Sequence, residues 1–210
     1  MDKMVWEKRD IEVTRLVEHH YPDAKLLVDG NDGYDLEGIL RFVEGVSDCG
    51  LYWIEEASEE TEQGLGILEE ALQKHLPGTL IVDGDARPPT RLQDPPGLFG
   101  KWRADLLEEL YECYGKSLID VLLMDIGATG FTAWRNVIPK LQDLGVWGSP
   151  QAWSEPYKTY YAAQVGCGLG RVSIVEGGPG VVEGVDDSGY LLEAGVLALP
   201  DSPGFGMELV

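Results

Sequence analysis

Acidic or amide residues directly follow the short apolar segments of this sequence. They are Asp29, Glu55, Asp85, Asp125, Gln151 and Glu176, separated by 26, 30, 40, 26 and 25 residues. Most of these intervals are close to the length of one strand plus one helix. In a parallel β/α barrel the carboxyl ends of all strands face one mouth, where such barrels keep their catalytic groups. The spacing therefore predicts that several carboxylates converge at one end of a sheet.

Converging carboxylates have a direct chemical consequence. Three of them repel one another unless some are protonated or a cation is present. Oxygen ligands favour a hard ion, and Mg²⁺ fits better than Ca²⁺ because three monodentate carboxylates leave octahedral positions for water and substrate. Any one of these residues is better explained as a helix cap in an acidic chain, but their regular recurrence at strand ends favours a metal site for the set.

The elements that must position these residues are apolar segments alternating with segments of helical periodicity. Strands are expected at 25–29, 51–54, 79–82, 118–124, 146–148 and 171–175, and helices at 8–20, 35–46, 62–75, 104–114, 132–144 and 155–165. The alternation implies parallel strands with right-handed crossovers. No Gly-x-Gly-x-x-Gly turn or phosphate loop supports a nucleotide-binding open sheet, so a barrel is favoured.

Charge and cysteine content exclude several classes of partner. The chain has 16 Lys and Arg against 37 Asp and Glu, a net charge of −21, which opposes binding to nucleic acid or to an anionic membrane surface. Three distant cysteines, Cys49, Cys113 and Cys167, predict neither a disulfide framework nor a thiolate metal site. With no signal-peptide or membrane-length apolar segment, we expect a cytoplasmic protein.

Several short runs in this order resemble the barrel domain of the enolase superfamily, in its mandelate racemase and muconate lactonizing branch. They are VDGN at 28–31, WIEE at 53–56, VDGD at 82–85, MD at 124–125 with GFT at 130–132, SIVE at 173–176 and LALPDSPGFG at 197–206. The similarity is greatest to sugar-acid dehydratase-like members. It implies an α/β fold, a partial (β/α) TIM-type barrel of about six parallel strands. One domain of residues 1–210 is expected, with a leading helix in 1–23, βα units in 24–176 and a Gly-rich tail in 177–210.

The same resemblance assigns the first group of site residues. It implies that Asp29, Glu55 and Asp85 bind Mg²⁺, although Asp85 replaces the more usual Glu and reaches one methylene less far. Asn31 would contact the substrate or support the metal ligands. In this family the metal holds a substrate carboxylate, a base removes the α-proton, and the resulting enediolate is stabilised electrostatically.

The catalytic residues implied by the resemblance are incomplete. Glu176 would hydrogen-bond the developing enediolate, and Asp125 would orient a histidine on the next strand. Gln151 stands where the family has that histidine, and an amide cannot exchange a proton at neutral pH. The three histidines present, His19, His20 and His75, fall on expected helices.

The chain also starts after the family's capping domain and after the strand that carries its Lys-x-Lys base motif. Six strands would leave two unpaired edges, so we expect a homo-oligomer or association with a missing N-terminal part. Two functions are expected from the sequence. The first is a Mg²⁺-dependent enzyme that abstracts the α-proton of a small hydroxy acid or sugar acid, as a dehydratase, racemase or epimerase. The alternative is a catalytically impaired barrel remnant, or the C-terminal part of a split enzyme, that only binds metal.

Overall fold

The computed structural model describes residues 3–58, 62–84, 93–94, 101–102, 119–153, 155–178 and 180–210. The chain forms two compact units. The first comprises residues 1–87 with 109–121, and the second comprises residues 88–108 with 122–210. Each unit is described separately below. Within the described ranges, no helix is both long enough and apolar enough to cross a membrane.

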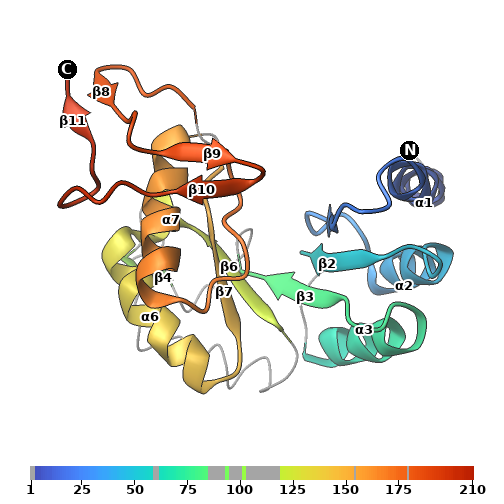
Figure 1. The fold of residues 1–210 in the computed structure, drawn as a ribbon. Coiled ribbons are helices and arrows are strands. Elements are labelled where there is room, and N and C mark those ends of the chain that lie inside the picture. Colours follow the sequence, from blue (N-terminus) through green and yellow to red (C-terminus); the bar gives the residue numbers. More distant parts are fainter. Residues whose placement is uncertain are drawn as a thin grey trace. The chain divides into compact units, whose positions relative to one another are not determined.

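The first unit alternates helices with parallel strands (Figure 1). Its elements are α1 (Lys3–His20), β1 (Leu26–Asp29), α2 (Leu36–Gly45), β2 (Leu51–Glu55), α3 (Glu62–His75) and β3 (Leu80–Asp83). Strand β2 pairs in parallel with β1 on one side and with β3 on the other. These bounds agree with the predicted elements to within a few residues, apart from α1, which begins five residues before its predicted start.

Helix α2 shows how the sequence produces this packing. Asp35 caps its first turn, where the carboxylate Oδ1 accepts the Gly38 N–H at 2.9 Å. Asp is a preferred residue at this position because its side chain satisfies a backbone donor that has no partner within the helix. Apolar side chains at helical spacing, Ile39, Phe42 and Val43, are fully buried and pack against the strands.

The second unit repeats the alternation and adds a tail (Figure 1). Its elements are β4 (Gln93–Asp94), β5 (Lys101–Trp102), β6 (Val121–Asp125, whose first residue falls in the first unit), α5 (Ile126–Thr129), α6 (Phe131–Asp143), β7 (Trp147–Gln151), α7 (Pro156–Leu169), β8 (Val185–Asp186), β9 (Leu191–Glu193), β10 (Val196–Ala198) and β11 (Glu208–Leu209). Short antiparallel pairs form in the tail, β9 with β10 and β8 with β11.

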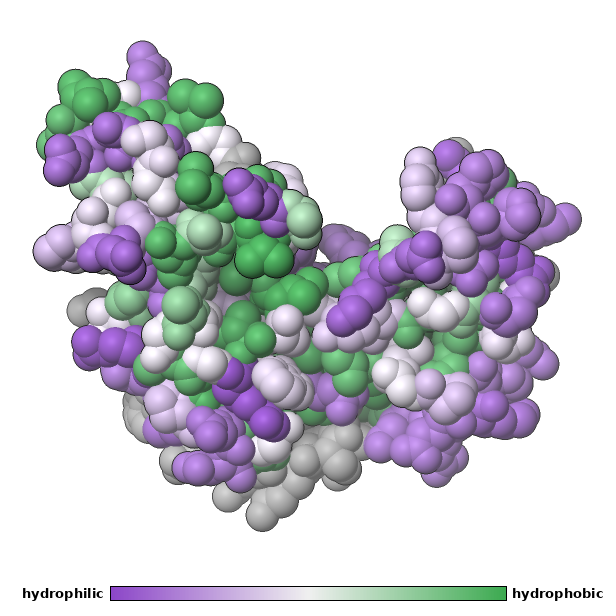
Figure 2. Space-filling view, in the orientation of Figure 1, coloured by the Kyte–Doolittle hydropathy of each residue, from purple (hydrophilic) through white to green (hydrophobic). Residues whose placement is uncertain are grey.

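Aromatic side chains attach this tail to α7. The rings of Tyr160 and Tyr190 stack with centroids 4.1 Å apart, and the Tyr190 hydroxyl donates to the Phe205 carbonyl at 2.5 Å. The Tyr160 hydroxyl donates to Asp187 Oδ2 at 2.8 Å. Leu192 and Val196 of the β9–β10 hairpin are exposed. Figure 2 shows green, hydrophobic surface over this hairpin.

The parallel strands among the described residues are five, β1, β2, β3, β6 and β7, rather than about six. The predicted strand at 171–175 is wrong as a continuous strand, because only isolated parallel bridges form, Gly148 with Val172 and Gln151 with Glu176. Pro150 of β7 explains the interruption, since proline has no N–H to donate to a neighbouring strand. The Ser149 hydroxyl donates to the Ile174 carbonyl instead, at 3.0 Å.

Two predicted elements cannot be compared with the structure. The predicted helix at 104–114 lies outside the described residues, and so does Asp85. The predicted domain organisation, one domain with a leading helix, βα units and a tail, stays a prediction. The α/β class and the alternation of parallel strands with helices are confirmed.

Candidate functional site

Asp29 and Glu55 occupy equivalent positions on neighbouring strands. Each is the last residue of its strand, and the two are partners in the parallel register of β1 and β2. Residues in register on adjacent strands point to the same face, about 4.8 Å apart along the hydrogen-bonding direction. The preceding residues, Val28 and Ile54, face the helices and join the hydrophobic core. Asp29 and Glu55 therefore lie on the opposite face, at the carboxyl ends of both strands.

The carboxylate of Asp29 is held by Asn31. The Asn31 backbone N–H donates to Asp29 Oδ1 at 2.7 Å, and its side-chain amide lies 3.5 Å from Oδ2. This arrangement requires a left-handed backbone at Asn31, with φ of 47°, and at Asp32, with φ of 52°. Non-glycine residues adopt that conformation at an energetic cost, and such segments concentrate at functional sites. Asn31 thus positions the Asp29 carboxylate.

Gly30 brings the ends of β1 and β2 together. Its N–H donates to the Glu55 carbonyl at 2.8 Å, and Asp32 donates to the Glu56 carbonyl at 2.9 Å. A Cβ atom on Gly30 would lie 2.7 Å from the Glu56 carbonyl oxygen, inside van der Waals contact. Only glycine allows this approach, so the relative placement of Asp29 and Glu55 depends on residue 30.

The chemistry of these residues fits a hard cation. Both side chains offer carboxylate oxygens, the ligand type that Mg²⁺ prefers. Glu55 is 4% exposed, and a buried carboxylate is favourable only when a cation or hydrogen-bond donors compensate its charge. The predicted third ligand, Asp85, lies outside the described residues. Within the described part of the chain, no group of three or more His, Cys, Asp or Glu side chains is placed to hold a metal.

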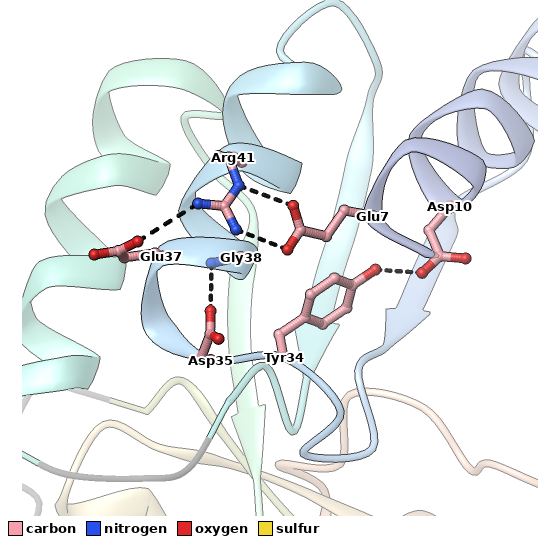
Figure 3. Close-up of polar contacts among 7 residues, drawn as sticks. All are labelled: Glu7, Asp10, Tyr34, Asp35, Glu37, Gly38 and Arg41. Atoms are coloured by element: carbon pink, nitrogen blue, oxygen red, sulfur yellow. Dashed lines mark hydrogen bonds and ion pairs between the residues drawn. The ribbon is translucent and has the colours of Figure 1, made fainter. Parts of the chain in front are cut away.

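A cavity of about 430 Å³ adjoins Asp29 within the first unit, lined in part by α1. Polar contacts join α1 to the segment around α2 (Figure 3). Arg41 forms two hydrogen bonds of 2.8 Å with the carboxylate of Glu7, and the Tyr34 hydroxyl donates to Asp10 at 2.5 Å. Burial, with the neighbouring Asp10 carboxylate, raises the pKa of Tyr34 above its ordinary value. These contacts hold one wall of the cavity in place.

In the second unit, the predicted catalytic residues also lie at strand ends. Asp125 is the last residue of β6 and Gln151 is the last residue of β7. Gln151 is buried, and it forms a parallel bridge with Glu176, whose carbonyl accepts the Ala152 N–H at 2.7 Å. Gln151 and Glu176 are therefore neighbours. Their roles in catalysis stay predictions.

Asp125 contacts a lysine that the sequence analysis did not single out. Its Oδ1 accepts the Ala128 N–H at 2.8 Å and caps α5, and its Oδ2 forms an ion pair of 2.9 Å with Lys158 Nζ. The sequence of the second unit contains no histidine for Asp125 to orient. A signal for Lys158 was present, because a basic residue in the first turn of a helix opposes the helix dipole and needs a compensating carboxylate.

Trp134, Trp147 and Trp153 of the second unit differ in environment. Trp134, on α6, is fully buried. Trp147 is 39% exposed, and the guanidinium of Arg171 lies 4.4 Å from its ring centroid. Trp153, two residues beyond β7, is 71% exposed. Of these three, Trp153 is the most exposed, and it follows the carboxyl end of β7.

Comparisons with known proteins found similar solved structures. No family profile matches the sequence, and none of the curated proteins matches it. Two solved structures are 30% identical to the chain over 97% of its length, each with a TM-score of 0.80. One is galacturonate dehydratase from Geobacillus sp. complexed with D-galacturonate and 5-keto-4-deoxy-D-galacturonate. The other is a mandelate racemase/muconate lactonizing protein from Geobacillus sp. Y412MC10 complexed with magnesium and tartrate.

More distant structures share the fold. The 3,6-anhydro-D-galactonate cycloisomerase from Zobellia galactanivorans is 18% identical, with a TM-score of 0.75 over 97% of the chain. The chain spans 50% and 48% of the two Geobacillus proteins and 53% of the cycloisomerase, about half the length of each. Its fold is accordingly a partial (β/α) barrel. The solved structures that the chain is similar to are proteins of the mandelate racemase and muconate lactonizing branch of the enolase superfamily.

Proposed function

We propose that this chain binds Mg²⁺ through Asp29, Glu55 and Asp85, and that the bound metal receives the carboxylate of a small hydroxy acid or sugar acid. The observation that carries the proposal is the register of Asp29 with Glu55 at the carboxyl ends of β1 and β2. Structures similar to this chain contain magnesium with tartrate, or D-galacturonate, which supports both the metal and the class of ligand.

Each residue has a defined part in this proposal. Bound Mg²⁺ would supply positive charge to the substrate carboxylate and to the negative charge that develops when an α-proton leaves. Asn31 fixes the carboxylate of Asp29 through its backbone N–H. Glu176, at the bridge to Gln151, would hydrogen-bond the developing enediolate. Dehydration, racemisation and epimerisation all begin with this proton abstraction.

A second candidate function is binding without turnover by the 210-residue chain alone. Gln151 favours it, because an amide neither accepts nor donates a proton at neutral pH. Asp125 favours it as well, because its carboxylate is engaged by Lys158 and by the α5 backbone. Positioned acids and bases contribute about 10²- to 10⁴-fold each to a rate, so losing one such group is severe. For the isolated chain we propose metal and acid binding with no measurable turnover.

Thermal denaturation with and without millimolar Mg²⁺ tests the metal site. Saturating metal should stabilise the protein by about 2.7 kcal/mol when its free concentration is 100 times the dissociation constant. The double variant Asp29→Asn with Glu55→Gln should lose this response. Asp143→Asn with Glu183→Gln is the matched control, since both residues are exposed in the second unit and the charge change is equal. A response that survives in the site variant argues against the proposed ligands.

Exchange of the substrate α-proton with deuterated water tests turnover. NMR of D-galacturonate incubated with Mg²⁺ and the purified chain should show no deuterium incorporation at the carbon next to the carboxylate. Incorporation that disappears in Glu55→Gln would show that a base is present in the chain. That result would favour the active enzyme over the binding function.

Association with other polypeptides stays part of the proposal. Val13, Leu16 and Leu27 in the first unit are 48%, 57% and 40% exposed, and such side chains favour contact with another protein surface. Sedimentation velocity of the purified chain should show a homo-oligomer, or a monomer that binds a separate capping polypeptide. A chain that sediments as a monomer both alone and when mixed with capping polypeptides contradicts this expectation.

A further inference from the structure

Lys158 lies in the first turn of α7, and two oxygen atoms fix the position of its ammonium group. Nζ lies 2.9 Å from Asp125 Oδ2 and 3.3 Å from the Trp153 carbonyl oxygen. An ammonium carries three hydrogens, so these two acceptors leave one N–H for another acceptor. The side chain is 15% exposed, which keeps part of it within reach of a ligand.

Glycine at residue 127 leaves room for the observed position of the Lys158 side chain. A Cβ atom on Gly127 would lie 2.5 Å from Lys158 Cε and 3.0 Å from its Nζ. The first turn of α7 has no acidic residue, so Asp125 supplies the compensating negative charge. Partial burial of two charges costs hydration energy, and an ion pair of this kind is weak evidence for a purely stabilising role.

The ammonium lies at the end of the strands where parallel α/β proteins bind ligands. Asp125 is the last residue of β6, and Trp153 follows the end of β7. Other basic residues in the described part of the second unit lie on other elements: Lys101 in β5, Arg135 and Lys140 on α6, and Arg171 against Trp147, the first residue of β7. Trp153, whose backbone carbonyl accepts from this ammonium group, has a side chain that is 71% exposed.

We propose that Lys158 is a substrate-binding residue whose third N–H donates to a carboxylate or hydroxyl oxygen of a hydroxy acid or sugar acid. Asp125 orients the ammonium, and the Trp153 ring covers the C–H face of the ligand. This inference rests on the proposed function for the class of ligand. It does not require the metal, because all three residues belong to the second unit.

Binding of a charged and an uncharged sugar in EDTA provides the test. D-Galacturonate and D-galactose differ at C6, a carboxylate in one and a hydroxymethyl group in the other. NMR titration of the full chain, read at the assigned Trp153 indole N–H, should show tighter binding of D-galacturonate. Lys158→Met should weaken D-galacturonate binding by about 10- to 100-fold, the range for a lost hydrogen bond to a charged group, and should leave D-galactose unchanged.

A charge-preserving variant separates this role from a structural one. Lys158→Arg should retain most of the preference for D-galacturonate. Loss of the fold would instead abolish binding of both sugars and reduce the chemical-shift dispersion of the NMR spectrum. If Lys158→Met is unstable, Lys158→Gln with the same readout replaces it. Unchanged D-galacturonate affinity in the folded neutral variant, or no response of the wild-type Trp153 signal to D-galacturonate, would overturn the inference.

The metal response distinguishes failure of this inference from failure of the proposed function. Lys158→Met should keep the full Mg²⁺-dependent rise in melting temperature, because Asp29 and Glu55 are untouched. If Mg²⁺ stabilises the protein and Lys158→Met binds D-galacturonate normally, only the inference fails. If Lys158→Met loses the acid but Mg²⁺ never changes the melting temperature, the metal site fails and the role of Lys158 stands.

Discussion

Replacing Gly30 with alanine tests whether close approach of β1 and β2 builds the site. The new Cβ would lie 2.7 Å from the Glu56 carbonyl oxygen, 3.2 Å from Ala57 Cα and 3.3 Å from the Ala57 carbonyl oxygen. Ordinary contact begins near 3.4 Å, so the first atom must move by 3.4 − 2.7 = 0.7 Å. All three are backbone atoms, which cannot move aside as a flexible side chain does.

The two strand ends must therefore separate. Overpacking of this kind costs about 1–3 kcal/mol. Weakening the hydrogen bond from Gly30 to the Glu55 carbonyl adds about 0.5–1.5 kcal/mol. Urea denaturation should show a lower midpoint for Gly30→Ala. Its Mg²⁺-dependent thermal response should also shrink, because the Asp29 and Glu55 carboxylates move apart.

Gly50→Ala is the control for this experiment. No atom lies within 4 Å of the Cβ position at Gly50, which directly precedes β2. Its unfolding free energy should change by less than about 1 kcal/mol, since the substitution mainly restricts the unfolded chain. A Gly30→Ala protein that unfolds at the wild-type urea concentration and keeps the full metal response would refute the reasoning about this contact.

Other predictions concern two partly or fully buried hydrogen-bonding side chains and one glycine within a helix. Burial raises the pKa of Asp120, whose Oδ2 accepts the Ile81 N–H at 2.9 Å. Asp120→Ala should lower the unfolding free energy by about 1–3 kcal/mol because it leaves this N–H without an acceptor. Asp120→Asn keeps an acceptor and should lower the unfolding free energy far less. Because the folded pKa is raised, the wild type should gain stability relative to Asp120→Asn as the pH falls through that pKa toward about 4. Burial and the Asp187 hydrogen bond raise the pKa of Tyr160 to about 12, so the stability advantage of wild type over Tyr160→Phe, measured by urea denaturation, should be complete below pH ~10 and shrink as the pH rises toward ~12. Gly168→Ala in α7, where no atom lies within 4 Å, should raise the melting temperature because alanine favours a helix by about 1 kcal/mol.

Local signals were sufficient to predict most of the first unit. Asp35 caps α2 and the apolar residues that follow repeat at helical spacing, so this helix is specified within its own segment. Asp29 and Glu55 were predicted to meet because each follows an apolar strand, and the register of β1 and β2 places them together. Neither inference needs information from distant parts of the chain.

The missed features depend on contacts between segments. The ion pair of Lys158 with Asp125 joins residues 33 positions apart, and the lysine side chain passes close to Gly127. The spacing of apolar residues along the sequence does not predict ion pairs between residues that are far apart in the chain. The interrupted strand at 171–175 had a visible cause in the sequence, since Pro150 removes a donor from its partner β7. The prediction considered the apolar character of 171–175 and not the hydrogen-bonding capacity of its neighbour.

Titration with Mn²⁺, a stand-in for Mg²⁺ that electron paramagnetic resonance detects directly, tests the central claim that Asp29 and Glu55 bind a divalent cation. The wild-type chain should show a saturable Mn²⁺ site from which Mg²⁺ displaces the ion. Asp29→Asn and Glu55→Gln should each weaken it by about tenfold or more, as expected for loss of a charged ligand, while Asp143→Asn on α6 should leave it unchanged. Mn²⁺ binding of wild-type affinity in the Asp29→Asn, Glu55→Gln double variant would contradict the account.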